Sequence, residues 1–234
     1  MVTAYLRHSS HRFYGASVAL VMLLLYESLV VWGEMPSGAM VRNAPEVWLR
    51  SILHFLGVPH YYISFAFITV FLIALPIFYR SGVRISKGIV LGILLESAFW
   101  GLLTGYIVRF FAVDFPLFSG GLTNSLLADL GLAIGAGLFE ELLFRVVLTT
   151  LLISIFKRLC GYPLPSVLLS VLIASFLFSL VHYVGNMGDP FTLYSFTFRF
   201  FAGIWFTTLY AVRGFAITCL THAFYDIFVL FAYP

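Results

Sequence analysis

Long apolar runs separated by short polar segments dominate this chain. About 20 consecutive apolar residues are enough for a helix to cross a bilayer, and the runs predict about seven such spans. A transmembrane β-barrel would instead alternate apolar and polar residues in short segments. The pattern therefore predicts an all-α fold, a polytopic bundle of transmembrane helices, with spans near residues 13–33, 60–79, 88–111, 126–156, 165–184, 194–212 and 215–233.

Two stretches outside these spans mix charged and apolar residues. The segment from Met35 to Val58 carries Arg42, Glu46 and Arg50 among apolar positions, which predicts an interfacial helix lying along the membrane surface. The polar, glycine-containing stretch from Asp114 to Asp129 leads into the fourth span and is expected to be interfacial or re-entrant.

Composition agrees with a membrane protein and excludes several functions. Hydrophobic residues make up 62% of the 234 residues and charged residues only 10%, with a mean hydropathy of +1.03, so residues 1–234 are expected to form one integral membrane domain. The net charge of +3 is too small to suggest nucleic-acid binding. Cys160 and Cys219 lack metal-binding spacing and are expected to be inert thiols.

The distribution of Lys and Arg predicts the orientation of the chain. These residues are more frequent in the N-terminal segment and the even-numbered loops than on the opposite side. Because cytoplasmic loops are enriched in positive charge, we expect a cytoplasmic N-terminus, in a prokaryotic cytoplasmic membrane. With seven spans the C-terminus would lie on the other side.

The stretch from Gly131 to Arg145 places charges inside an apolar helix. Burying a charge near the bilayer centre costs at least a few kcal/mol, so such groups face the bundle interior or a wet cavity and have partners. Glu141 and Arg145 stand at i and i+4 in the favourable order for an ion pair. Glu140 is left without a partner on this helix, on a face that it shares with small residues, among them Gly137.

Two later segments offer groups that can meet Glu140. Phe178 and His182 lie one helical turn apart, as do His222 and Asp226, so each pair shares a helix face. A single histidine in a membrane helix can simply hydrogen-bond a neighbouring helix, but three polar groups on three helices indicate a functional cavity. The other acids within spans, Glu27 and Glu96, are expected to pack or to pair with Arg109 or Arg199.

These motifs together resemble a known family. The EExxxR element (Glu140, Glu141, Arg145), the FxxxH element (Phe178, His182) and the HxxxD element (His222, Asp226) are similar, in this order, to those of the CPBP family, which contains type II CAAX prenyl proteases, bacteriocin-processing proteins and Abi proteins. The resemblance makes residues 131–233 a CPBP-like catalytic core and residues 1–112 supporting N-terminal spans.

The resemblance implies a glutamate-dependent intramembrane endopeptidase. Glu140 would be the general base that activates water together with His182, and His222 with the residue four positions later would form the oxyanion pocket. That residue is Asp226 here, where the prenyl proteases have Asn. Because an ionised Asp cannot donate a hydrogen bond, Asp226 is expected to orient and charge His222 instead. Glu141, Arg145 and Phe178 would be supporting residues, and no cofactor would be needed.

Two other function classes fit the same residues. One is a zinc-dependent hydrolase in which Glu140, His182 and His222 bind Zn²⁺; the other is a non-enzymatic membrane immunity or interaction protein. The expected partners are the lipid bilayer and a membrane-associated protein or peptide: a prenylated C-terminus, a bacteriocin leader or a C-terminal sorting tail.

The rise of a straight α-helix predicts the depth of these residues in the membrane. Glu140 and His182 are expected at similar depths, nearer the non-cytoplasmic face. His222 is expected only about 12 Å above Gly214, so the turn at Gly214 must be recessed into the membrane or the last span must be tilted.

Overall fold

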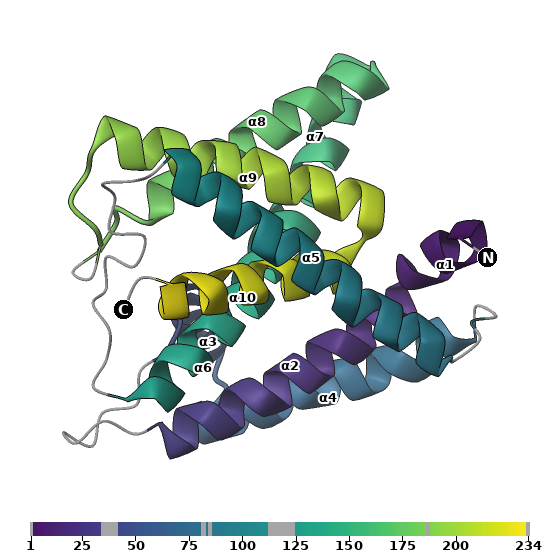
Figure 1. Ribbon diagram of the computed structural model, residues 1–234, viewed down its shortest axis with the longest axis vertical. Coiled ribbons are helices and arrows are strands. Elements are labelled where there is room, and N and C mark those ends of the chain that lie inside the picture. The colour runs from purple at the N-terminus through teal and green to yellow at the C-terminus, as the bar shows by residue number, and fades with distance from the viewer. Residues whose placement is uncertain are drawn as a thin grey trace.

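The computed structural model describes residues 2–33, 42–80, 83, 86–111, 125–185 and 188–232. Within these ranges the protein is all-α, without strands, as predicted (Figure 1). The helices are α1 (Val2–Ser9), α2 (Arg12–Trp32), α3 (Ala44–Phe55), α4 (His60–Tyr79), α5 (Lys87–Phe111), α6 (Leu126–Gly135), η1 (Ala136–Glu140), η2 (Leu142–Thr149), α7 (Thr150–Cys160), α8 (Pro163–Val181), α9 (Leu193–Arg213) and α10 (Phe215–Ala232).

A helix covers each of the seven predicted spans. Five helices of the described chain, α2, α4, α5, α8 and α10, are long and apolar enough to cross a membrane, so the chain is an integral membrane protein. The predicted span 126–156 corresponds to the continuous run from α6 to α7, and the predicted span 194–212 corresponds to α9. The number of crossings stays a prediction.

Helix α10 lies at the centre of the bundle. It packs against α5 along its length and also contacts α2, α6, η1 and α9, and Figure 1 shows α5 crossing directly over it. Helices α2 and α4 lie side by side on one edge (Figure 1). This placement leaves α10 enclosed, so polar side chains on α10 face other helices instead of lipid.

The turn between α9 and α10 is covered by the N-terminal helix α1, which the sequence did not predict. Gly214 in this turn has φ +76°, a conformation that favours glycine, and a Cβ there would lie 3.0 Å from the carbonyl oxygen of Ser10. Arg213 donates hydrogen bonds to Glu96 on α5 at 2.6 and 2.7 Å and to Ser9 at 2.9 Å. The turn is therefore packed against the end of α1, and its depth in the membrane stays a prediction.

A second charged cluster fixes the amphipathic helix α3. Glu27 on α2 pairs with Arg42 at 3.1 Å and with Arg50 at 2.7 Å, and Glu46 pairs with the same two arginines. Glu27 and Glu96 are thus paired within the bundle, but Glu27 pairs with Arg42 and Arg50, and Glu96 pairs with Arg213. The side chain of Arg109, residues 35–41 of the predicted interfacial segment and residues 114–124 lie outside the described residues.

Candidate active site

The two adjacent glutamates lie within a π-helical stretch. Residues Ala136–Glu140 and Leu142–Thr149 form π-helix, with Glu141 between them. The π-helix closes i→i+5 hydrogen bonds and is often found at functional sites. Its wider turns also rise less per residue than an α-helix, so the α-helical rise assumed in the sequence-based depth does not hold over this stretch.

Glu141 and Arg145 form the predicted ion pair in the protein interior. The Nε of Arg145 lies 3.1 Å from Oε2 of Glu141, and the two side chains are 1% and 0% exposed. The guanidinium carbon also lies 4.3 Å from the centre of the Phe178 ring, which favours a cation at that place. This pair fixes η2 against α8 and is sealed from solvent.

Gly137 allows α10 to approach the glutamates closely. A Cβ atom at this position would lie 2.5 Å from the carbonyl oxygen of Cys219 and 2.8 Å from the backbone nitrogen of Ala223. Real Cβ atoms do not approach other atoms so closely, so any other residue would separate η1 from α10. The small residue that the sequence analysis placed beside Glu140 thus determines the position of His222.

His222 is held between carboxylates and an aromatic ring. Its Nδ1 lies 2.7 Å from Oε1 of Glu141, while its Nε2 lies 4.0 Å from Oε2 of Glu140 and 3.6 Å from Oδ2 of Asp226. The Phe206 ring stacks on the imidazole with centroids 4.5 Å apart. His222 therefore donates its Nδ1 hydrogen bond to Glu141, a contact that the sequence did not indicate. The role expected of Asp226, which lies on the Nε2 side, stays a prediction.

His182 lies just past the last residue of α8 and is oriented by its own helix. Its Nδ1 lies 2.7 Å from the carbonyl oxygen of Phe178. Because a carbonyl only accepts, Nδ1 carries the proton and Nε2 of the neutral ring presents a lone pair. The charge of Glu140 acts on His182, so these two groups from η1 and α8 lie within electrostatic reach of each other.

Exposure separates the acids of this cluster into two kinds. The side chains of Glu140 and Asp226 are 13% and 15% exposed, whereas that of Glu141 is fully buried. Among the described residues no hydrogen bond is made to the Glu140 side chain, and the Nε2 of His222 lies 4.0 Å from its Oε2. A water or a substrate can reach Glu140 but not Glu141.

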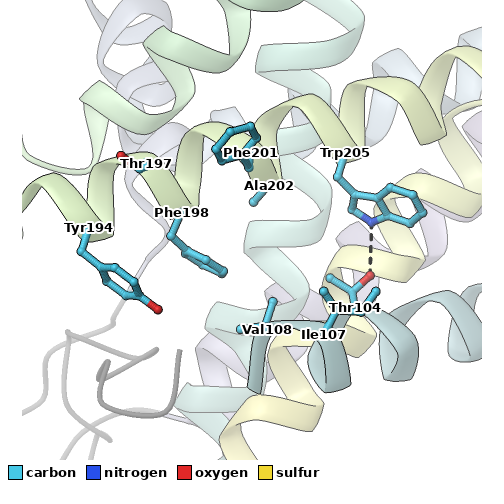
Figure 2. A pocket seen from close by; sticks show the side chains of 9 residues that line it. All are labelled: Thr104, Ile107, Val108, Tyr194, Thr197, Phe198, Phe201, Ala202 and Trp205. Atoms are coloured by element: carbon cyan, nitrogen blue, oxygen red, sulfur yellow. Dashed lines mark hydrogen bonds between the residues drawn. The ribbon is translucent and has the colours of Figure 1, made fainter. Parts of the chain in front are cut away.

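Two cavities lie near this cluster, and neither is lined by its polar residues. The first, about 540 Å³, lies between α5 and α9 and is almost entirely apolar; Figure 2 shows Trp205 of α9 donating a hydrogen bond to Thr104 of α5 at its edge, at 3.2 Å. Trp205 lines this cavity, and the next residue, Phe206, stacks on His222. Helix α9 therefore contributes a wall to both the cavity and the polar cluster. The second cavity, about 700 Å³, lies on the other side of η2, where Leu142 and Val146 line it.

The sequence did not indicate several of these contacts. Phe206 lies in an aromatic-rich span in which nothing distinguishes it, and Gly137 was noted only as small. Asp189 and Arg199, which form an ion pair beside His182, lie in different segments with no shared motif. In the part of the chain that the structure describes, no three His, Cys, Asp or Glu side chains are grouped closely enough to hold a metal ion.

These observations define an integral membrane helical bundle with a glutamate–histidine cluster at its centre. Residues 122–228 match the model of the family described as type II CAAX prenyl endopeptidase Rce1-like. In this region the chain is similar to the CAAX protease family, as the motifs indicated. The search of curated proteins and the search of solved structures gave no match. The family match covers the whole polar cluster, from Glu140 to Asp226.

Proposed function

We propose that this protein is a glutamate-type intramembrane endopeptidase that cleaves a membrane-associated protein or peptide with a water activated by Glu140 and His182. The observation that carries the proposal is the difference between the two adjacent glutamates. Glu141 is buried and engaged by Arg145 and His222, whereas Glu140 is partly exposed and lies 4.0 Å from the Nε2 of His222. A free carboxylate beside an imidazole is what general-base catalysis requires.

In the proposed reaction Glu140 removes a proton from a water molecule, which adds to the carbonyl carbon of the scissile peptide bond. The carbonyl π electrons move to the oxygen and form a tetrahedral oxyanion. Collapse of this intermediate breaks the C–N bond, and the proton taken from water goes to the leaving amine. General base and acid catalysis of this kind contributes about 10²–10⁴-fold in rate.

His182 and His222 would divide two further tasks. His182, with its proton on Nδ1, can accept a hydrogen bond from the attacking water at Nε2. His222 donates from Nδ1 to Glu141, so it can donate from Nε2 to the oxyanion only as an imidazolium. Glu140, Glu141 and Asp226 surround this ring and Phe206 stacks on it, and all four contacts favour the charged form.

The apolar cavity between α5 and α9 supports a substrate with a lipid-like or strongly apolar part, such as a prenyl group. Its volume of about 540 Å³ lies in the roughly 300–1,000 Å³ range of ligand sites. A C-terminal sorting tail or a bacteriocin leader also satisfies the chemistry at Glu140. We further propose a cytoplasmic N-terminus, which reporter fusions at both ends of the chain would test.

The test is cleavage of a quenched-peptide library by the purified protein in detergent, including prenylated and unmodified peptides. Glu140→Gln keeps the size of the side chain but cannot accept a proton, so we expect a loss of about 10²-fold or more. Leu168→Met, at an exposed site on α8, is the control for handling and folding, because it keeps the side chain apolar on a helix that can face lipid. Full activity of Glu140→Gln would refute the proposal, and activity that disappears with a chelator and returns with Zn²⁺ would replace it with a zinc hydrolase.

A further inference from the structure

The ion pair between Asp189 and Arg199 has no part in the proposed reaction. Arg199 on α9 pairs with Asp189, which precedes α9, and donates a hydrogen bond to Ser195 at 2.9 Å. Their side chains are 11% and 18% exposed. Removing a charged pair from water has a desolvation cost that can exceed the Coulomb attraction between the two charges. A gain in stability therefore does not explain why the pair lies at this place.

The pair is connected directly to the backbone of His182. The N–H of Asp189 donates to the carbonyl oxygen of His182 at 2.8 Å, while the ring of His182 is held from the other side by the carbonyl of Phe178. Asp189 therefore contacts Arg199 with its side chain and His182 with its main chain. A shift of Asp189 would move the last turn of α8, on which His182 lies.

A second connection runs through the next residue. The hydroxyl of Tyr183 donates to Ser195 at 2.6 Å, and the guanidinium carbon of Arg199 lies 5.2 Å from the centre of the Tyr183 ring. Arg199 and Tyr183 thus share Ser195 as a hydrogen-bonding partner. His182 is consequently attached to α9 through the residue that follows it and through Asp189.

The charges of the pair also act on His182. The charged groups that influence its ring are Glu140 from η1, Arg199 from α9 and Asp189 from the connection between α8 and α9. The two members of the pair act in opposite directions, because Asp189 favours the imidazolium and Arg199 opposes it. Removal of either member alone therefore leaves the effect of the other unopposed.

We propose that the Asp189–Arg199 ion pair positions His182 against Glu140 and places one charge of each sign beside its ring. This inference rests on the proposed role of His182 as a partner of the activated water. Neither residue contacts the reacting atoms, so both are positioning residues. Their contribution is expected in kcat and not in KM, since a misplaced base partner slows the chemical step without removing substrate contacts.

The experiment compares Asp189→Asn and Arg199→Gln in full pH–rate profiles on a cleaved peptide. Each variant is expected to lower kcat about 10–100-fold with KM nearly unchanged. On the acid limb, the low-pH side of the profile, activity falls as His182 takes up a proton. This limb is expected to move to lower pH in Asp189→Asn, which removes a negative charge, and to higher pH in Arg199→Gln, which removes a positive one, by about 0.5–1 pH unit each. Arg199→Lys, which keeps the charge, should hold the acid limb near its wild-type position.

A matched control comes from a second ion pair of the same kind. Arg213 and Glu96 are 9% and 19% exposed, close to the values for Arg199 and Asp189, but they lie at the turn beneath α1. Arg213→Gln is expected to lower the thermal unfolding temperature and leave the acid limb in place. The positioning proposal is wrong if Asp189→Asn and Arg199→Gln also lower stability but leave the acid limb in place. It is equally wrong if the two variants move the acid limb in the same direction.

The two proposals fail in distinguishable ways. Activity of Glu140→Gln equal to wild type would overturn the proposed function, and the positioning role with it. Loss of activity in Glu140→Gln together with unmoved acid limbs in the Asp189 and Arg199 variants would overturn only the positioning role. Arg199→Lys keeps the test decisive if Arg199→Gln fails to fold. The proposal is then supported if the acid limb of Arg199→Lys stays at the wild-type pH while the acid limb of Asp189→Asn moves to lower pH.

Discussion

The Nδ1 atom of His222 lies 2.7 Å from Oε1 of Glu141, which joins the first motif of the chain to the last across 81 residues. The other oxygen of the same carboxylate faces Arg145 at 3.1 Å. One buried glutamate therefore accepts from a histidine and pairs with an arginine at the same time. This arrangement leaves the neighbouring Glu140 as the acid that is open to chemistry.

Replacing Glu141 should damage both stability and activity. In Glu141→Gln the amide oxygen can still accept from His222, but Arg145 loses its counter-charge while it remains 1% exposed. An unpaired buried charge costs about 3–5 kcal/mol, so the thermal unfolding temperature measured in detergent should fall markedly. Glu140→Gln should unfold close to the wild-type temperature, and equal stability of the two variants would contradict this assignment of roles.

The close approach at Gly137 makes a second prediction. In Gly137→Ala the new methyl group would lie 2.5 Å from the carbonyl oxygen of Cys219, so α10 must move away from η1. Overpacking of this kind costs about 1–3 kcal/mol, and the His222–Glu141 hydrogen bond should lengthen. We expect activity to fall about tenfold or more. Gly88→Ala, where the methyl group would lie 3.6 Å from its nearest neighbour, should leave cleavage unchanged.

The residue beside His222 can be tested by the substitution that the resemblance suggests. Asp226 lies 3.6 Å from the Nε2 of His222 and is 15% exposed. In Asp226→Asn the amide can itself donate a hydrogen bond to an oxyanion, so activity should stay within about tenfold of wild type. Asp226→Leu offers neither charge nor donor and should lose about 10²-fold or more. Equal kcat values for the two variants would exclude Asp226 from the reaction.

The sequence predicted the helices and the polar cluster because both depend on local patterns. Apolar runs long enough to span a bilayer must form helices, since no water is present to satisfy the backbone. The cost of charge in lipid requires that Glu140, Glu141, His182 and His222 face inward. Three inward-facing motifs on neighbouring helices then have to lie near one another, and the pairing of Glu141 with Arg145 needed only the i, i+4 spacing.

The contacts that the sequence missed depend on tertiary packing. The π-helical stretch arises from a shift in backbone hydrogen bonding that no side-chain pattern marks, so the sequence-based depth of Glu140 assumed the wrong helix geometry there. The partner of His222 was assigned to Asp226 by spacing, whereas a close helix contact at Gly137 brings Glu141 nearer. Asp189 and Arg199 meet only because α8 and α9 pack together.

Helix α1 should be released at alkaline pH. Burial, with the nearby Glu96 carboxylate as a further cause, raises the pKa of Tyr5 from 10.0 to about 12, and the protonated phenol donates to Glu96 at 2.6 Å. Because the folded pKa is above the unfolded one, this contact stabilises α1 fully below about pH 10 and is lost as pH rises through about 12. Protease cleavage of the N-terminal segment should increase over that window.

Two variants separate this effect from general alkaline unfolding. Tyr5→Phe has no phenol to donate or ionise, so its N-terminal segment should be cleaved faster at neutral pH and show a weaker dependence on alkaline pH. Tyr61→Phe, at a side chain that is 70% exposed on α4, should behave like wild type. A Tyr5→Phe protein with the wild-type alkaline profile would show that another group releases α1.

The apolar cavity between α5 and α9 makes the last prediction, which concerns substrate choice. Ala202 lies in its wall (Figure 2). Phe206 follows about one helical turn later in the sequence. In Ala202→Trp the indole would fill part of the roughly 540 Å³. If the cavity receives a prenyl group, KM for prenylated peptides should rise about tenfold or more, because each buried CH₂ contributes about 0.8 kcal/mol.

The comparison with unmodified peptides makes this prediction specific. Ala202 does not belong to the glutamate–histidine cluster, so kcat/KM for a peptide without a lipid should change less than about threefold in Ala202→Trp. Leu168→Trp adds a similar ring on the exposed face of α8 and should leave both substrates unaffected. A parallel loss on both substrates in Ala202→Trp would mean that the tryptophan disturbs Phe206 and His222, and an unchanged KM for prenylated peptides would exclude this cavity as the lipid site.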